Sequence, residues 1–233
     1  MIPLKDLTPR RSFPFITLLL IIVNLLVFIH QVTLSPRAAD AFIKTYGLVP
    51  WKIQSALAGR HYTYEEALLP LFTCMFLHGG FFHILGNMWF LWIFGGNVED
   101  RFGSFSYLLF YVVCGIGSGV AQVAFSWGSH IPSVGASGAI SGVLGAYIVF
   151  FPGSRILSLV TLFIIWFMAR IPAVIFIGLW FVMQFLSGVG SLAQTGDSSA
   201  GGVAWWAHVG GFLLGVLGAG ILRPQASRAY SSY

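Results

Sequence analysis

The stretch FITLLLIIVNLLVFIHQVTL, residues 15–34, is largely apolar and contains no Asp, Glu, Lys or Arg. A helix of about 20 such residues is long enough to cross the hydrocarbon core of a bilayer. The preceding segment carries Lys5, Arg10 and Arg11 and resembles the start of a secretory signal sequence. Because no small-x-small cleavage site follows and more apolar runs come after it, we predict an uncleaved first transmembrane span.

The whole chain has the composition of a membrane protein. Over 233 residues, hydrophobic residues make up 57% and charged residues 8%, whereas soluble domains have about 25% charged residues. A soluble domain of this length could not bury so much apolar surface. The net charge of +5 does not indicate nucleic-acid binding, because the basic residues stand at the ends of apolar runs and form no stripe with interleaved aromatics. We therefore predict the lipid bilayer as the surroundings.

Five further apolar runs follow the first, at residues 71–94, 105–125, about 135 or 137 to 151, 171–192 and 203–222. We predict a polar loop over 35–70, and Pro172 in the first turn of the fifth span. The fourth run has only about 15 residues, so its N-terminal end is expected below the membrane surface. Residues 155–170 could form an extra interfacial or re-entrant helix, or a seventh crossing. The predicted fold is an all-α bundle of six transmembrane helices.

Basic residues predict the orientation of these spans. With a cytoplasmic N-terminus, basic residues on the outer side of the membrane occur only in the first long loop, and the other basic residues lie on the cytoplasmic side. This agrees with the positive-inside rule. The expected organisation is a cytoplasmic N-terminal segment (1–14), a membrane domain (15–222) and a disordered cytoplasmic tail (223–233).

Ser137 stands among small residues, in Gly135-Ala136-Ser137-Gly138, at the start of the fourth run. Its hydroxyl would be unshielded, a substrate backbone could approach across glycine, and its own N–H would lie at the positive end of a helix. These properties suit a nucleophile. The other interpretation is helix packing, because Gly138 and Gly142 form a small-xxx-small pattern in which serine is common.

His208 begins the sixth run, and Gly211 and Gly215 repeat the same four-residue spacing. If this face packs on the Gly138 and Gly142 face, the imidazole comes level with Ser137. A close crossing would place it within hydrogen-bond reach of the hydroxyl, as a general base requires. A histidine bonded to a backbone carbonyl within the bundle is the alternative.

The second run contains His78, His83 and Asn87. His83 and Asn87 are four residues apart and therefore share a helix face, where their side chains could donate to an oxyanion. Structural hydrogen bonding is the other interpretation. A metal site is not favoured, because there is no His-Glu-x-x-His motif and no acidic residue well inside a span. We predict no metal and no cofactor.

Other polar residues are assigned supporting roles. The turn 96–103 contains Glu99, Asp100 and Arg101, which we expect to cap and tie helix ends. The histidines at 30, 61 and 130 lie in loops or at a span end and are expected to be interfacial or solvated. The two cysteines, Cys74 and Cys114, are predicted to be buried free thiols.

These motifs together resemble the rhomboid family of intramembrane serine proteases. The resemblance rests on His78-x4-His83-x3-Asn87, Glu99-Asp-Arg-Phe-Gly103, Gly135-Ala-Ser137-Gly138 and Ala207-His208-x2-Gly211-x3-Gly215. It implies that Ser137 is the nucleophile and His208 the base of a dyad without a third acid. His83 and Asn87, with the Ser137 N–H, would hold the oxyanion, while His78 is supporting. The implied partners are transmembrane protein substrates, and the implied location is a bacterial inner membrane.

The sequence departs from some relatives at three places. Ser141 stands where some bacterial rhomboids carry a tyrosine against the histidine, Cys74 where some have a third histidine, and a Trp-Arg pair is not evident in the first loop. These differences concern the support of the dyad. A non-catalytic rhomboid-like binder of membrane proteins is the alternative function. A transporter would need buried ionisable groups or an inverted repeat, which the sequence does not contain.

Overall fold

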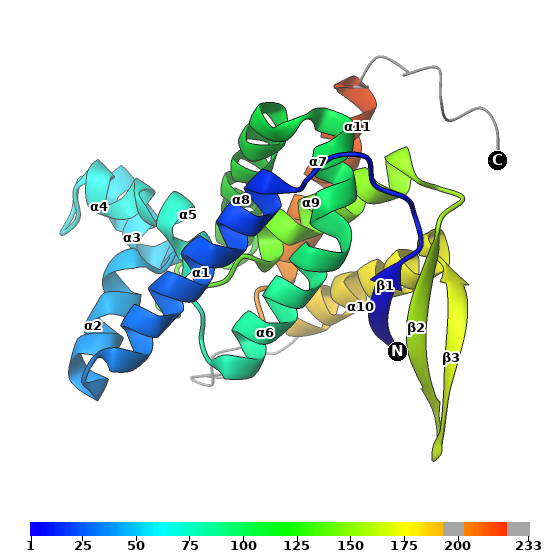
Figure 1. The fold of residues 1–233 in the computed structure, drawn as a ribbon. Helices are drawn as coiled ribbons and strands as arrows, with labels where there is room; N and C mark the ends of the chain where they lie inside the picture. The colour runs from blue at the N-terminus through cyan, green and yellow to red at the C-terminus, as the bar shows by residue number, and fades with distance from the viewer. Residues whose placement is uncertain (193–202, 223–233) are drawn as a thin grey trace.

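The apolar runs fold into helices of unequal length (Figure 1). The computed structural model describes residues 1–192 and 203–222. Within this part, α1 (Phe15–Thr33), α8 (Ser104–Phe125) and α10 (Ala173–Leu192) are long and apolar enough to cross a membrane. α9 (Ser137–Phe150) and α11 (Trp205–Ile221) are apolar but shorter, and α9 begins at Ser137 as predicted. The protein is therefore an integral membrane protein built mainly from helices. The predicted tail, 223–233, lies outside the described residues.

The second apolar run is bent, although we predicted one continuous span. It lies within a broken pair of helical segments. The first contains α4 (Tyr64–Leu68), α5 (Pro70–Thr73) and the 3₁₀ turn η1 (Cys74–Phe76), and the second, after a break, contains α6 (Phe81–Phe90), the π-helical turn η2 (Leu91–Gly95) and α7 (Gly96–Phe102). The two halves form an angle of 76°. The Gly79-Gly80 pair in the break explains the bend, because glycine weakens a helix interior. His78 consequently lies in the break and not on a helix.

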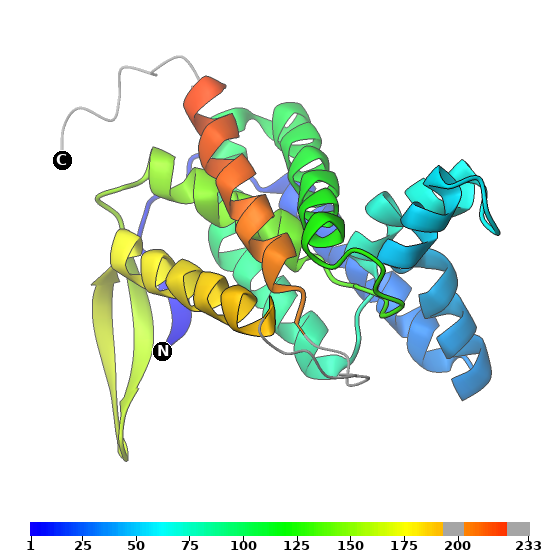
Figure 2. The ribbon, with the colours of Figure 1, turned by 180° about the vertical axis from the view of Figure 1, so that it is seen from behind.

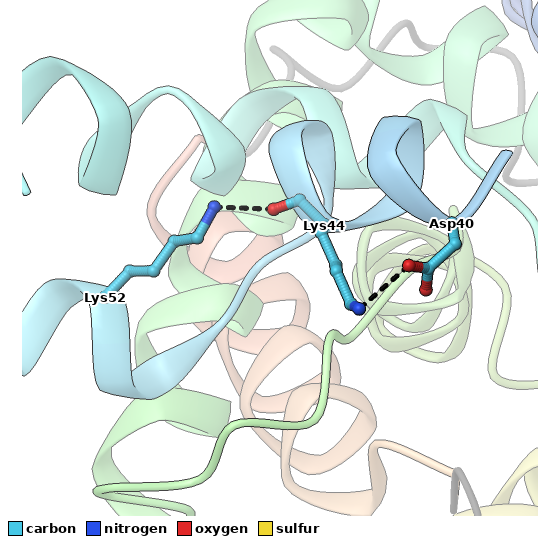
Figure 3. A network of polar contacts seen from close by, with 3 residues as sticks. All are labelled: Asp40, Lys44 and Lys52. Atoms are coloured by element: carbon cyan, nitrogen blue, oxygen red, sulfur yellow. Dashed lines mark hydrogen bonds and ion pairs between the residues drawn. The ribbon is translucent and has the colours of Figure 1, made fainter. Parts of the chain in front are cut away.

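The predicted loop 35–70 contains two further helices, α2 (Pro36–Tyr46) and α3 (Pro50–Leu57). Both begin with proline in the first turn, where its missing N–H costs nothing, and Ser35 caps α2 by accepting from the Ala38 N–H. Figure 3 shows two polar contacts here: Lys44 pairs with Asp40 within α2 at 2.8 Å, and Lys52 of α3 donates to the Lys44 carbonyl and so joins the two helices. The loop predicted over 35–70 is therefore partly helical. Its helices are polar and short, so no apolar run in the sequence marks them.

A three-stranded antiparallel sheet corrects the all-α prediction. Its strands are β1 (Ile2–Asp6), β2 (Arg155–Leu162) and β3 (Ile165–Pro172), in the order β1-β2-β3. The helix predicted over 155–170 is therefore wrong, and Pro172 ends β3 instead of starting a helix. Residues 155–172 are rich in β-branched and aromatic side chains, which favour strands, and the N-terminal segment supplies a partner strand that the local sequence did not predict.

Polar contacts join the sheet to the helices. The Trp89 indole N–H on α6 donates to the Pro3 carbonyl at 2.6 Å, and the Thr8 hydroxyl bonds to Ser154 at 2.7 Å and Tyr147 at 3.0 Å. The N-terminal segment is thus packed against the bundle and is not separate from it. In Figure 1 the sheet stands beside the start of α10.

The centre of the bundle is the crossing of α9 and α11. Seen from behind, α11 (orange to red) passes between α8 and α10, with α9 beneath it (Figure 2). A Cβ built on Gly211 would lie 2.0 Å from the Gly138 carbonyl oxygen, so the two backbones touch. This confirms the predicted packing of the two glycine faces, and it follows the small-residue rule for helices in lipid.

The turn 96–103 has the predicted structural role. Glu99 is 1% exposed, and its carboxylate accepts from the N–H groups of Ile16 and Thr17, each at 2.9 Å, and from the Ser104 hydroxyl at 2.7 Å. These N–H groups belong to the first turn of α1, where they have no helical partner. Glu99 therefore caps α1 from α7. The two cysteines are also as predicted, buried and free.

Candidate active site

Ser137 is the first residue of α9 and lies half-buried at the start of the helix. Its backbone N–H is one of the four at a helix start that lack an intrahelical acceptor, and it lies at the positive end of the helix dipole. The next residue, Gly138, packs closely against Ser118 of α8. A Cβ at position 138 would lie 2.1 Å from the Ser118 hydroxyl oxygen.

His208, in the first turn of α11, lies beside this hydroxyl. Its Nε2 is 2.7 Å from Ser137 Oγ, and its side chain is buried, with 8% exposed. The crossing of Gly211 over Gly138 sets this distance, because Gly211 lies three residues after His208 and Gly138 lies one residue after Ser137. The structure therefore brings together the two residues that the sequence placed on separate spans.

Gln184 on α10 completes the contacts of the imidazole, and sequence reasoning missed it. The other ring nitrogen of His208, Nδ1, lies 2.6 Å from Gln184 Oε1, and the glutamine side chain is 8% exposed. A polar residue within an apolar span is expensive and therefore a functional candidate. This rule, applied to Gln184, would have found it. The resemblance implied a dyad without a third acid, and the group on Nδ1 is a neutral amide.

His83 and Asn87 converge on one point, beside Gly135. A Cβ built on Gly135 would lie 2.7 Å from His83 Nε2 and 3.5 Å from Asn87 Nδ2. His83 Nδ1 accepts from the Gly79 N–H at 3.2 Å, so the ring proton resides on Nε2, which faces Gly135. Among the described residues, the buried Asn87 Nδ2 has no hydrogen-bond partner. Two donors are thus directed at the backbone just before Ser137.

Gly135 itself adopts a backbone that favours glycine. Its φ is +126°, and its N–H donates to the Cys74 carbonyl at 2.9 Å. A side chain at this position would be strained and would also displace His83. We expected a supporting role for Gly135, Gly138 and Gly211. Gly135 lies against the His83 side chain, Gly138 against the Ser118 side chain, and Gly211 against the Gly138 backbone.

His78 lies next to the site without joining it. Gln31 of α1 accepts from the His78 N–H at 3.0 Å and donates to its carbonyl at 3.2 Å, which fixes the break between η1 and α6. The buried imidazole lies edge-on to His83, with ring centroids 5.2 Å apart. The His78 ring thus packs against the His83 ring.

A small cavity adjoins Ser137 on the side of α8. Its volume is about 20 Å³, and its polar lining comes from Ser118, Gln122, Ser133 and Ser137. This is enough space for one water molecule with several polar partners. Gln122 is held in place because its Oε1 accepts from the Ala207 N–H at 3.1 Å.

The remaining histidines make aromatic contacts away from the site. His61 and His130 stack on Trp51, at 6.2 Å and 4.5 Å between centroids, and His30 lies edge-on to Phe42 at 5.4 Å. Among residues 1–192 and 203–222, no group of three or more His, Cys, Asp or Glu side chains gathers where a metal ion could be held.

The fold and the site together define the class of protein. It is an integral membrane helical bundle in which a serine at a helix start is hydrogen-bonded to a histidine of a neighbouring helix. Comparison with known proteins then gives the family. The Rhomboid domain model matches residues 65–225, so the chain belongs to the rhomboid family.

Curated relatives agree with this assignment. The chain is 32% identical over 162 residues to RHOMBOID-like protein 1 of Arabidopsis thaliana, covering 70% of this chain and 37% of that one. It is 34% identical over 183 residues to RHOMBOID-like protein 2 of the same plant, covering 76% and 51%. A shorter match to Rhomboid protease GluP of Bacillus subtilis is 45% identical over 76 residues, covering 33% and 14%. The chain thus spans about half or less of the length of these relatives.

Proposed function

We propose that the protein is an intramembrane serine endopeptidase that hydrolyses a peptide bond in transmembrane segments of membrane-protein substrates. The observation that carries this proposal is the 2.7 Å distance between His208 Nε2 and Ser137 Oγ. A nucleophile within hydrogen-bond reach of a base, with the base held by a third group, is the arrangement of covalent acyl-transfer enzymes. Membership of a family that includes a relative named a protease supports it.

In the first step Ser137 Oγ attacks the scissile carbonyl carbon while His208 Nε2 takes the hydroxyl proton. The resulting tetrahedral intermediate carries a negative oxygen. It collapses by breaking the C–N bond, and His208 returns its proton to the leaving amine. The substrate's N-terminal part is then an ester of Ser137.

The negative oxygen needs donors that are already in place. We assign this role to the Ser137 N–H, His83 Nε2 and Asn87 Nδ2. Two observations support this assignment. The buried Asn87 Nδ2 has no partner among the described residues. His83 Nδ1 accepts from the Gly79 N–H, which leaves the ring proton on Nε2. Donors fixed in a water-poor site stabilise developing charge far more than donors that must reorient.

In the second step water attacks the ester with His208 as the base. The C–O bond to Ser137 breaks, the acid product leaves, and His208 returns a proton to Oγ. Water must therefore reach a site among apolar helices. The cavity beside Ser137, about 20 Å³ and lined by Ser118 and Gln122, is a suitable place to hold one molecule.

The substrate must present an extended backbone to Ser137. A membrane-spanning helix satisfies its own N–H and C=O groups, so cleavage requires local unwinding. We therefore propose as substrates transmembrane segments with helix-weakening residues near the cut and a small residue before it, as the family resemblance implies.

We also propose six crossings with both termini in the cytoplasm, and an inner bacterial membrane as the location. The described helices supply three clear crossings, a bent pair and two short apolar helices. In this topology Ser137, His208 and His83 all lie near the outer ends of their spans. Segments 1–14 and 223–233 would then face the cytoplasm, with residues 15–222 as the membrane domain.

Cleavage of a model single-span substrate by the full chain in proteoliposomes tests the proposed activity. We expect Ser137→Ala and His208→Ala to lower kcat by a factor on the order of 10⁶, below detection. Matched controls are Ser191→Ala, whose hydroxyl donates to the Gly188 carbonyl of its own helix, and His130→Ala, which stacks on Trp51. Both should cleave like the parent.

Parent-like cleavage by Ser137→Ala would refute the protease assignment. Absence of cleavage by the parent, together with no labelling of Ser137 by a fluorophosphonate, would instead favour a non-catalytic rhomboid-like binder of membrane proteins.

A further inference from the structure

α10 contacts the bundle along a narrow stripe. Its buried residues recur at helical spacing, and they are Ala173, Phe176, Ile177, Gln184 and Gly188. The rest of the helix exposes large apolar side chains, as a lipid-facing helix does. Gln184 is the only polar member of the buried stripe. A buried amide is unfavourable unless it forms hydrogen bonds, and the partner of this one is His208.

Packing fixes Gln184 relative to α11. One turn before it, the Phe181 ring stacks on Phe212 of α11, with centroids 4.4 Å apart, and the Trp180 ring lies 6.0 Å from the His208 ring. One turn after it, Gly188 lets Trp206 approach, since a Cβ at 188 would lie 3.2 Å from that indole. Contacts on both sides therefore hold the amide opposite the imidazole.

The geometry of the bond selects one state of the histidine. A neutral imidazole has one N–H and one free lone pair. Gln184 Oε1 can only accept, so at 2.6 Å it requires the proton on Nδ1. The lone pair is then on Nε2, which faces Ser137 Oγ at 2.7 Å. The opposite tautomer would direct a donor at the serine and could not take its proton.

We propose that Gln184 is the positioning residue of the dyad: its side-chain oxygen holds the Nδ1–H of His208, so that Nε2 is oriented and unprotonated towards Ser137. This inference rests on the proposed protease function. A triad aspartate fills the same place in soluble serine proteases, and a neutral asparagine does so in papain-like enzymes. A neutral amide suits a membrane interior, because a buried carboxylate is more expensive there.

The proposal also explains a departure from some relatives. Ser141 stands where some bacterial rhomboids have a tyrosine against the histidine, and its hydroxyl here donates to the Ser137 carbonyl of its own helix at 2.6 Å. It therefore does not reach the imidazole. Support for His208 comes instead from α10, through Gln184 and Trp180.

Three variants of the full chain test this role in proteoliposomes, with Ser191→Ala on the same helix as the control. Gln184→Met keeps the length of the side chain and removes the acceptor. We expect kcat to fall about 10- to 100-fold with KM unchanged, because a misplaced base slows chemistry and not binding. Gln184→Asn, one methylene shorter, should lose activity similarly. Gln184→Glu keeps the acceptor and should retain most of the activity at high pH.

The pH profile separates positioning from a merely structural role. In Gln184→Glu the carboxylate stabilises the protonated imidazole, so the acid limb of kcat against pH should move to higher pH. The other histidine of the site is His83 on α6, beside Gly135. It is unchanged in all variants, so the shift would report on position 184. Ser191→Ala should leave the limb where it is.

Two results would overturn the inference. One is parent-like kcat in Gln184→Met. The other is an equal loss in Gln184→Met and Gln184→Glu with an unmoved acid limb. Should Gln184→Met not fold, the near-isosteric Gln184→Glu decides alone through its pH profile. Failure of the protease function itself would look different, because Ser137→Ala would then cleave like the parent.

Discussion

Gly215 of α11 and Gly142 of α9 cross so closely that a Cβ on Gly215 would lie 2.0 Å from the Gly142 carbonyl oxygen. Gly211 and Gly138 repeat the same contact one turn nearer the dyad. Two successive backbone contacts define both the distance and the rotation of the helices. The serine and the histidine are therefore placed by residues that have no side chains, and the precision of the site depends on the absence of a methyl group.

Gly215→Ala tests this dependence away from the reacting groups. The added Cβ meets backbone that cannot rotate aside, so the helices must separate, and we expect a loss of about 1–3 kcal/mol in the free energy of unfolding. Gly220→Ala on the same helix is the control, because a Cβ there meets no described residue within 4 Å. Unfolding in mixed micelles measures both. Equal stability of the two variants would contradict the close crossing.

Glu99 provides a second prediction, in which the stability of the protein falls while its activity is unchanged. Glu99→Gln removes the negative charge that accepts from the first turn of α1 and turns an N–H₂ group towards other donors. Hydrogen bonds to a charged group contribute about 1.5–3 kcal/mol each, so we expect a loss of about 2–3 kcal/mol. kcat at a temperature where the variant is folded should match the parent.

Asp100→Asn is the control for Glu99. Asp100 accepts from the backbone and hydroxyl of Ser12, but this contact is exposed, so its loss should change stability by less than about 1 kcal/mol. If Asp100→Asn were the more harmful of the two, the assignment of Glu99 as the cap would be wrong.

Asn87 allows a kinetic test of the oxyanion donors. Asn87→Ala should lower kcat by about 10²- to 10³-fold, the effect of removing one such donor, with KM little changed because the charge develops only in the transition state. Asn24→Ala is the matched control, since the Asn24 amide donates to the Leu20 carbonyl within α1. A higher KM with unchanged kcat would instead assign Asn87 to substrate binding.

Much of the site was predictable because its residues are anomalies in their surroundings. Ser137, His208, His83 and Asn87 are polar groups in apolar runs, and the paired glycine spacings indicated which two helices cross. Gln184 had the same anomaly but belonged to none of the motifs that the sequence analysis singled out, so a rule based on motifs passed over it. Its partner, 24 residues further along the chain, appears only once α10 and α11 are packed.

The fold was less predictable wherever a segment depends on a distant partner. Residues 155–172 are apolar without a helical or strand period, and the bracketing Arg155 and Arg170 suggested an interfacial helix. β2 pairs with β3 on one edge and with β1 on the other, where Ile2 lies opposite Leu159, 157 residues further along the chain. Similarly, the bend at Gly79-Gly80 is fixed by Gln31 of another helix. Local composition could not indicate either partner.

The N-terminal strand provides the last prediction. β2 lies between β1 and β3, so removing residues 1–6 should free the β2 amides that bond to β1 while those that bond to β3 stay protected. Hydrogen–deuterium exchange of the parent and the shortened chain in detergent measures this, with α9 amides as the internal reference. We expect faster exchange at alternate residues of 156–159, because neighbouring residues of a central antiparallel strand bond to opposite partners. If the amides of 155–170 in the parent all exchanged at the same rate, or were protected as in a helix, the sheet would not form.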